Sequence, residues 1–131
     1  MSNILSKLKF PIASMTKNMK VINDKISLLE LRQMAEKMFG NLVKGVVDIK
    51  KEIMVLDGEL HADEESSLLE NGSEQKNLWG INLYPELEGD DFIEFDSMIN
   101  LRPSQGNRSR GVEDPAIREK IKAIVKKLIK K

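Results

Sequence analysis

The chain of 131 residues has no cysteine, one histidine, one tryptophan, one tyrosine and four phenylalanines. Without cysteine it has no disulfide, no thiol nucleophile and no cysteine-ligated zinc or iron–sulfur site. A single histidine favours a cation with oxygen ligands over zinc. So few aromatic residues offer little surface for stacking bases, and we expect no nucleic-acid binding.

Long apolar runs and nucleotide-binding motifs are also missing. No run approaches the roughly 20 residues that a membrane-spanning helix needs, and neither the G-x-x-x-x-G-K nor the G-x-G-x-x-G spacing occurs. The content of 40% hydrophobic and 32% charged residues is typical of a soluble globular protein. We therefore expect a cytoplasmic protein without a membrane partner.

Charge is segregated along the chain, although the formal net charge is zero. Residues 61–100 contain 11 acids and one base, whereas residues 101–131 contain 10 bases and three acids. Two halves that neutralise each other inside the fold would explain this pattern. Exposed faces of opposite sign would explain it as well, and these would bind ions or join copies of the chain in a homo-oligomer.

Residues 1–20 differ from the rest because they contain four lysines and no acid. They lack the apolar stretch of about 7–15 residues that a secretory signal requires. We expect them to form a loosely ordered N-terminal extension, followed by a single α+β domain over residues 21–131.

Three segments carry helix signals. Ser27 and Glu30 form an S-x-x-E capping box before an apolar repeat, which predicts a helix over about 28–39. A second helix is predicted from residue 61 to 71, where Asn-Gly ends it. Asp114 and Pro115 open a third helix as N-cap and first residue. Its predicted buried stripe consists of Ile117, Ile121, Ile124, Val125 and Leu128.

Four segments predict strands, at residues 42–49, 53–60, 78–84 and about 92–101. Trp79 shares a strand face with Ile81 and Leu83, so we expect it in the core. The order α-β-β-α-β-β-α predicts an α+β fold. Its small antiparallel four-stranded sheet would be covered on one face by about three helices.

Three stretches resemble an uncharacterised prokaryotic family of unknown function. They are ELHADEE at 59–65, LWGINLYPE at 78–86 and DFIEFDSMINLRPSQGNRSRGVEDP at 91–115. The resemblance implies a small stand-alone domain of bacterial or archaeal type. It implies no catalytic residue.

The most unusual segment is RPSQGNRSRG at 102–111, which contains three arginines and leads to the start of the last predicted helix. Guanidinium groups and backbone N–H groups near a helix N-terminus bind phosphate and carboxylate. Arg102, Asn107, Arg108 and Arg110 are therefore predicted to hold an anionic ligand, such as a phosphate-bearing small molecule. Alternatively, the arginines pair with the acids of the preceding segment.

A second candidate site is built from carboxylates. Glu59, His61 and Asp63 alternate, as do Glu94 and Asp96, so each set would share one face of an extended chain. Oxygen ligands with one imidazole suit Mg²⁺ or Mn²⁺. This cluster predicts a metal-dependent phosphoester hydrolase. The alternative is that these acids only solvate an exposed sheet face.

Three functions therefore stay open at this stage. The first is a binding domain for an anionic ligand at the arginine-rich loop, and the second is the metal-dependent hydrolase. The third is a protein-interaction domain without a small-molecule site.

Overall fold

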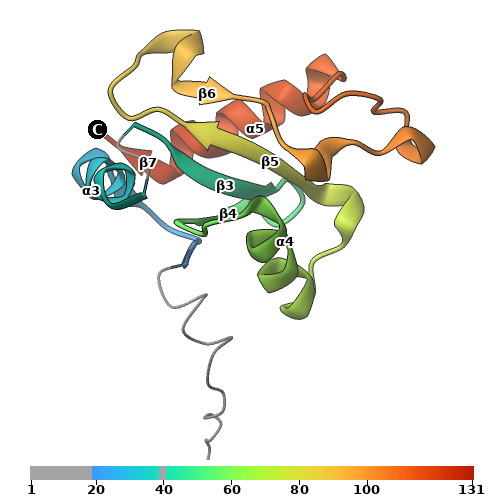
Figure 1. Ribbon diagram of the computed structural model, residues 1–131, viewed down its shortest axis with the longest axis horizontal. Coiled ribbons are helices and arrows are strands. Elements are labelled where there is room, and N and C mark those ends of the chain that lie inside the picture. Colours follow the sequence, from blue (N-terminus) through green and yellow to red (C-terminus); the bar gives the residue numbers. More distant parts are fainter. Residues whose placement is uncertain (1–18, 39–40) are drawn as a thin grey trace, which may run out of the picture.

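The computed structural model describes residues 19–38 and 41–131 (Figure 1). The predicted N-terminal extension lies outside these residues, except for Met19 and Lys20. Lys20 already belongs to a strand that the sequence did not predict, β1 (Lys20–Ile22).

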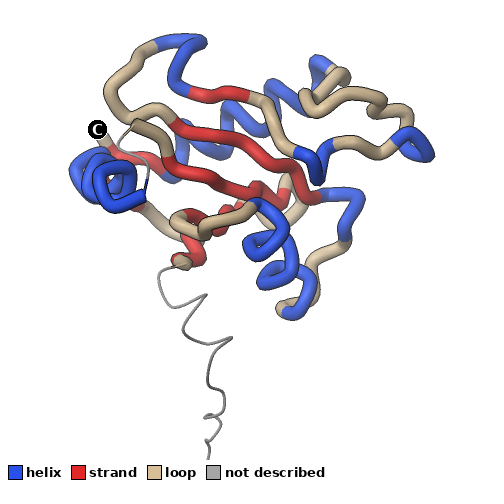
Figure 2. Tube along the Cα trace, in the orientation of Figure 1, coloured by secondary structure: helices blue, strands red, loops and turns tan. Residues whose placement is uncertain are grey.

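The centre of the molecule is an antiparallel sheet of five strands in the order β1-β4-β3-β5-β6 (Figure 2). Its other strands are β3 (Val43–Asp48), β4 (Ile53–Leu56), β5 (Leu78–Leu83) and β6 (Ile93–Glu94). The predicted hairpin between β3 and β4 is confirmed. Its turn is held by the carboxylate of Asp48, which accepts the backbone N–H groups of Lys50 and Lys51.

Two predicted strands are shorter in the structure than the sequence indicated. β4 ends at Leu56 because Asp57 adopts a positive φ of 72° and turns the chain away. The strand predicted over residues 92–101 is wrong beyond Glu94. After it the chain forms a short 3₁₀ helix, η3 (Met98–Asn100), held to β5 by side-chain hydrogen bonds instead of a strand ladder.

The three predicted helices are α3 (Leu28–Met38), α4 (His61–Glu70) and α5 (Pro115–Leu128). Residue 39, the predicted end of the first, lies outside the described residues. Ser27 Oγ accepts the Glu30 N–H at 3.1 Å, and Asp114 accepts the Ala116 N–H at 2.8 Å, so both N-terminal caps are formed.

Short elements complete the fold. Further 3₁₀ helices are η1 (Gln75–Asn77), η2 (Gly89–Phe92) and η4 (Pro103–Gln105). A parallel pair, β2 (Ile26–Ser27) with β7 (Ile129–Lys130), joins the start of α3 to the end of α5.

Helices cover both faces of the sheet, which corrects the prediction of one covered face. α3 and α5 pack on the face that carries Val47 and Trp79. α4 packs through Leu68 on the opposite face, where Val46 and Leu78 lie. In Figure 1, α5 passes behind the strands and α4 lies on the viewer's side. Strands that are buried on both faces have continuous apolar sequences and do not alternate with polar residues. Their pattern therefore did not indicate that a helix covers the second face.

Within the described residues, no helix is long and apolar enough to cross a membrane.

The main core depends on Ile81, which is fully buried in the middle of β5. Ile81→Ala is expected to lower the free energy of unfolding by about 2–5 kcal/mol, since neighbouring strands restrict collapse of the cavity. Leu29→Ala is the control, because Leu29 is 63% exposed on α3. It is expected to change stability by about 0.5 kcal/mol or less. Urea unfolding measures both, and equal losses would contradict this core.

Candidate functional site

Arg102 lies inside the arginine-rich loop and is only 8% exposed. Its guanidinium donates to the carbonyls of Ile99 and Gln75, each at 2.9 Å, and to that of Leu78. The guanidinium carbon also lies 4.5 Å from the centre of the Trp79 ring. The donors that an anion would need are thus directed at backbone carbonyls, so Arg102 holds the loop to β5. Trp79 is buried as predicted.

Asn107 is the second brace of this loop and is also buried. Its Nδ2 donates to the carbonyls of Asn100 at 2.7 Å and Gly111 at 2.8 Å, and its Oδ1 accepts the Glu113 N–H at 2.9 Å. These bonds replace the backbone ladder that an irregular segment lacks. These bonds therefore hold the loop in one shape although it contains little regular structure.

Of the four residues predicted to bind an anion, only Arg108 has a guanidinium group that contacts no other group in the described part of the chain. Arg110 pairs with Asp96 at 2.6 Å, which is the alternative that the sequence left open. Arg108 is exposed, and its backbone N–H, not its side chain, donates to Glu113. The loop thus offers a single arginine rather than a pocket of converging donors.

The predicted carboxylate cluster is only partly brought together. Asn82 Nδ2 donates to Glu94 Oε1 at 2.9 Å and to the backbone carbonyl of Asp96 at 3.2 Å, whereas the Asp96 carboxylate pairs with Arg110. His61 lies near them, and Glu59 is exposed in the turn before α4. Asp63 is in the first turn of α4. Among the described residues, no three acidic or histidine side chains form a group that could hold a metal ion.

His61 instead covers a row of polar side chains on the α4 face of the sheet. Lys44, Asn82 and Glu94 lie in register on β3, β5 and β6. His61 Nε2 donates to the Ile81 carbonyl at 2.8 Å. Burial lowers the pKa of His61, and the hydrogen bond to the Ile81 carbonyl offsets part of this shift.

Glu64 is the most deeply buried charged residue near this row. Its Oε2 accepts the Gly58 N–H at 2.9 Å, whereas its Oε1 has no hydrogen-bond partner among the described residues. Burial raises the pKa of Glu64 well above its ordinary value. Sequence reasoning missed Lys44, Glu64 and Asn82. A signal did exist for Glu64, because it stands three residues after His61 and four before Leu68, on the helix face that packs against the sheet.

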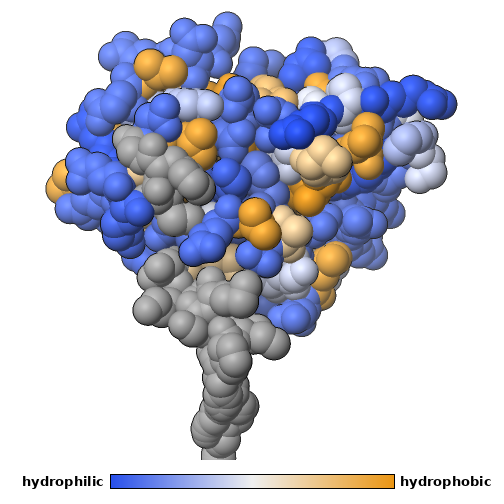
Figure 3. Space-filling view, viewed as in Figure 1, coloured by the Kyte–Doolittle hydropathy of each residue, from blue (hydrophilic) through white to orange (hydrophobic). Residues whose placement is uncertain are grey.

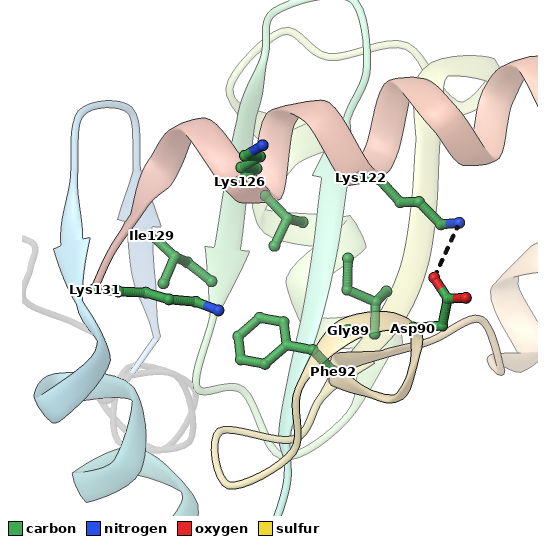
Figure 4. Close-up of a pocket in the computed structure, with 9 residues that line it drawn as sticks. Gly89, Asp90, Phe92, Lys122, Lys126, Ile129 and Lys131 are labelled. Carbon is green, nitrogen blue, oxygen red and sulfur yellow. Dashed lines mark ion pairs between the residues drawn. The ribbon is translucent and has the colours of Figure 1, made fainter.

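A cavity lies on the other face, between α5 and the η2 loop (Figure 4). Its volume is about 450 Å³, within the range of small-molecule sites. Apolar walls come from Phe92, Ile93, Val125 and Ile129. Sequence reasoning placed Val125 in the core and missed the hollow beside it.

Three lysines line this cavity, and we call it the lysine pocket. Lys126 has no ion pair within the described residues, and Lys131 Nζ lies 5.3 Å from the centre of the Phe92 ring. Lys122 Nζ is 3.9 Å from Asp90 and 3.4 Å from Glu119. Figure 4 shows Lys131 directed at Phe92, and Lys122 at Asp90 on the far side. The cavity therefore has an apolar interior, with two lysines, Lys126 and Lys131, that form no ion pair within the described residues.

A family model described as "Protein of unknown function (DUF5674)" matches residues 20–128. No curated protein matches the chain, and no solved structure does so. The matched range contains both the braced loop and the lysine pocket, except for Ile129 and Lys131.

Removal of a loop brace should destabilise the whole domain. Asn107→Ala leaves buried carbonyls without a donor and is expected to cost at least about 2 kcal/mol of unfolding free energy. Arg108→Ala changes an exposed residue of the same loop and is expected to cost about 0.5 kcal/mol or less. Chemical denaturation compares the two, and an Asn107 variant as stable as the wild type would show that the braces contribute nothing.

Burial of Glu64 should produce a specific pH dependence. Because its folded pKa is raised, the unfolded chain ionises first as pH rises above about 4.5, and the wild type loses stability from there up to the folded pKa. Glu64→Gln cannot ionise, so its stability relative to wild type is expected to increase over this window. Urea unfolding between pH 4 and 8 measures the difference. Ser66→Ala, on the exposed side of α4, serves as the control, and a constant difference for Glu64→Gln would contradict the burial effect.

Proposed function

The chain belongs to the DUF5674 family of proteins of unknown function, and we propose that it is a binding domain for a small anionic ligand with an apolar body. The lysine pocket is the site. The observation that carries this proposal is that three lysines from α5 and the residues after it surround one apolar cavity.

The apolar walls support the proposal because they fit a ligand whose body is apolar. Phe92, Val125 and Ile129 belong to the main core, yet each has a side facing the cavity. A saturated or aromatic hydrocarbon group that fills the cavity would remove this surface from water, at about 25 cal/mol for each Å². A purely polar ion would leave it hydrated.

The lysines indicate that the other end of the ligand carries a negative charge. Lys126 has no competing carboxylate among the described residues, and Lys131 contacts an aromatic face in place of an acid. An ammonium group binds carboxylate or phosphate as a compact point charge with three donors. Asp90 lies at the edge of the cavity and would disfavour an anion there, so we assign the ligand's charged group to the end near Lys126 and Lys131.

This proposal retains the phosphate- or carboxylate-bearing ligand expected from the sequence and places it at a different site. Arg102 and Asn107 are engaged in bracing, so the arginine-rich loop offers fewer donors than the lysine pocket. No observation favours the metal-dependent hydrolase, since the five residues predicted for it form no such group in the described part of the chain.

Calorimetric titration with octanoate and with hexyl phosphate tests the site. Both are expected to bind, while octanol, which lacks the charge, is expected to bind at least about tenfold more weakly. Lys126→Ala should weaken octanoate binding about tenfold, or about 1.4 kcal/mol. Lys120→Ala, on the exposed side of α5 and outside the pocket, should leave binding unchanged. Equal effects of the two substitutions, or no binding of either anion, would overturn the proposal.

A further inference from the structure

The charge segregation of the sequence is not cancelled inside the fold. Among the described residues, two ion pairs join an acid of residues 61–100 to a base of residues 101–131. They are Asp96 with Arg110, and Asp90 with Lys122 at 3.9 Å. The first explanation considered for the sequence, mutual neutralisation, thus accounts for few of the charges.

The two signs of charge lie on opposite sides of the molecule. α4 contains four acids and no base, whereas α5 contains five bases and one acid. α4 packs on the sheet face of Val46, and α5 packs on the face of the neighbouring residue Val47. Successive residues of a strand point to opposite faces, so the sheet separates the two helices.

The outer side of each helix presents its charge to solvent. On α4 and the turns beside it, we call five acids the acidic face: the exposed Glu59, Glu70 and Glu74 and the half-buried Asp63 and Glu65. Lys51 and Lys76 border it and offset part of its charge. On α5 and β7, we call the exposed lysines the basic face: Lys120, Lys126, Lys127 and Lys130. Two acids lie among them: Glu119 of α5, and Glu52 of the turn between β3 and β4, which pairs with Lys127.

Each face also offers uncharged surface that a partner can cover. Leu60 is 56% exposed and Leu69 is 40% exposed beside the acids, and Ala123 is exposed between the lysines. Figure 3, from the side of α4, shows a mostly hydrophilic surface broken by several apolar spots. The small side chain of Ala123 permits close approach to the middle of α5.

We propose that copies of this chain associate head to tail, the acidic face of one copy against the basic face of the next. The two faces complement each other in charge, and each copy carries both. Because the faces lie on opposite sides of the sheet, one pair of copies cannot satisfy both at once. The contact is heterologous, so it generates a ring of several copies or an open chain.

A second copy fits these faces better than a polyanion such as a nucleic acid. A polyanion would use the basic face alone and would be repelled by the acidic face. The charges are exposed, so the association is of the weak class and is screened by salt, with a Debye length of about 8 Å at 0.15 M.

Sedimentation velocity of the full chain at 20 and 500 mM salt tests the proposal. At low salt and rising protein concentration, the sedimentation coefficient is expected to increase beyond that of two copies, and at high salt it should return to that of one copy. Ser66→Lys with Glu70→Lys adds three positive charges to the acidic face, and Lys120→Glu with Ala123→Glu adds three negative charges to the basic face. Each double variant therefore cancels most of the charge of one face and leaves the other face intact. Each double variant should remain a single copy at low salt.

The two double variants provide their own rescue. Mixed together at low salt, the first contributes an intact basic face and the second an intact acidic face, so they are expected to associate as pairs of one copy each. Gln33→Lys with Glu36→Lys makes the same charge change on the exposed side of α3, and is expected to associate like the wild type. Circular dichroism confirms that each variant is folded.

Three results would overturn the proposal. They are a wild type that stays a single copy at low salt, double variants that do not associate when mixed, and association that only one of the double variants abolishes. The last result would indicate a contact that does not use both faces. None of the substitutions lies in the lysine pocket, so octanoate binding by the same variants separates failure of this inference from failure of the proposed ligand site.

Discussion

The hydrogen bonds between Asn100 and Gly80 are the contact on which the second half of the fold depends. Asn100 is fully buried, and its side chain both accepts the Gly80 N–H at 2.8 Å and donates to the Gly80 carbonyl at 3.0 Å. One side chain thus replaces a strand beside β5. The contact requires glycine, because a Cβ at position 80 would lie 2.5 Å from the Ser97 Cβ. Arg102 and Asn107 then hold the rest of the loop to the sheet and to itself.

This contact also explains which parts of the fold the sequence could predict. The helices were predictable because their signals are local: the Ser27 and Asp114 caps are formed as expected. The end of β6 was not, because Phe95 and Ile99 continue the alternation of a strand while the side chain of Asn100 bonds to the distant backbone of Gly80. Residue spacing contains no information about such bonds.

In the candidate sites too, the sequence did not show the features that depend on contacts between distant residues. An arginine in a polar loop looks alike in sequence whether it faces solvent, as Arg108 does, or donates to buried carbonyls, as Arg102 does. The lysine pocket was harder to foresee, since its walls read as core and its lysines read as charges that suit the C-terminal end of a helix. The cavity arises because the η2 loop packs against α5. This is a tertiary contact, so the local sequence pattern does not show it.

The parallel pair of β2 with β7 has a consequence for the order of folding. It joins Ile26 to Ile129, residues about a hundred positions apart, so it forms only after the sheet and α5 have brought them together. Ile129 is also a wall of the lysine pocket. The cavity is therefore complete only when this long-range contact has formed, and occupancy of the cavity would report that both ends of the described domain are in place.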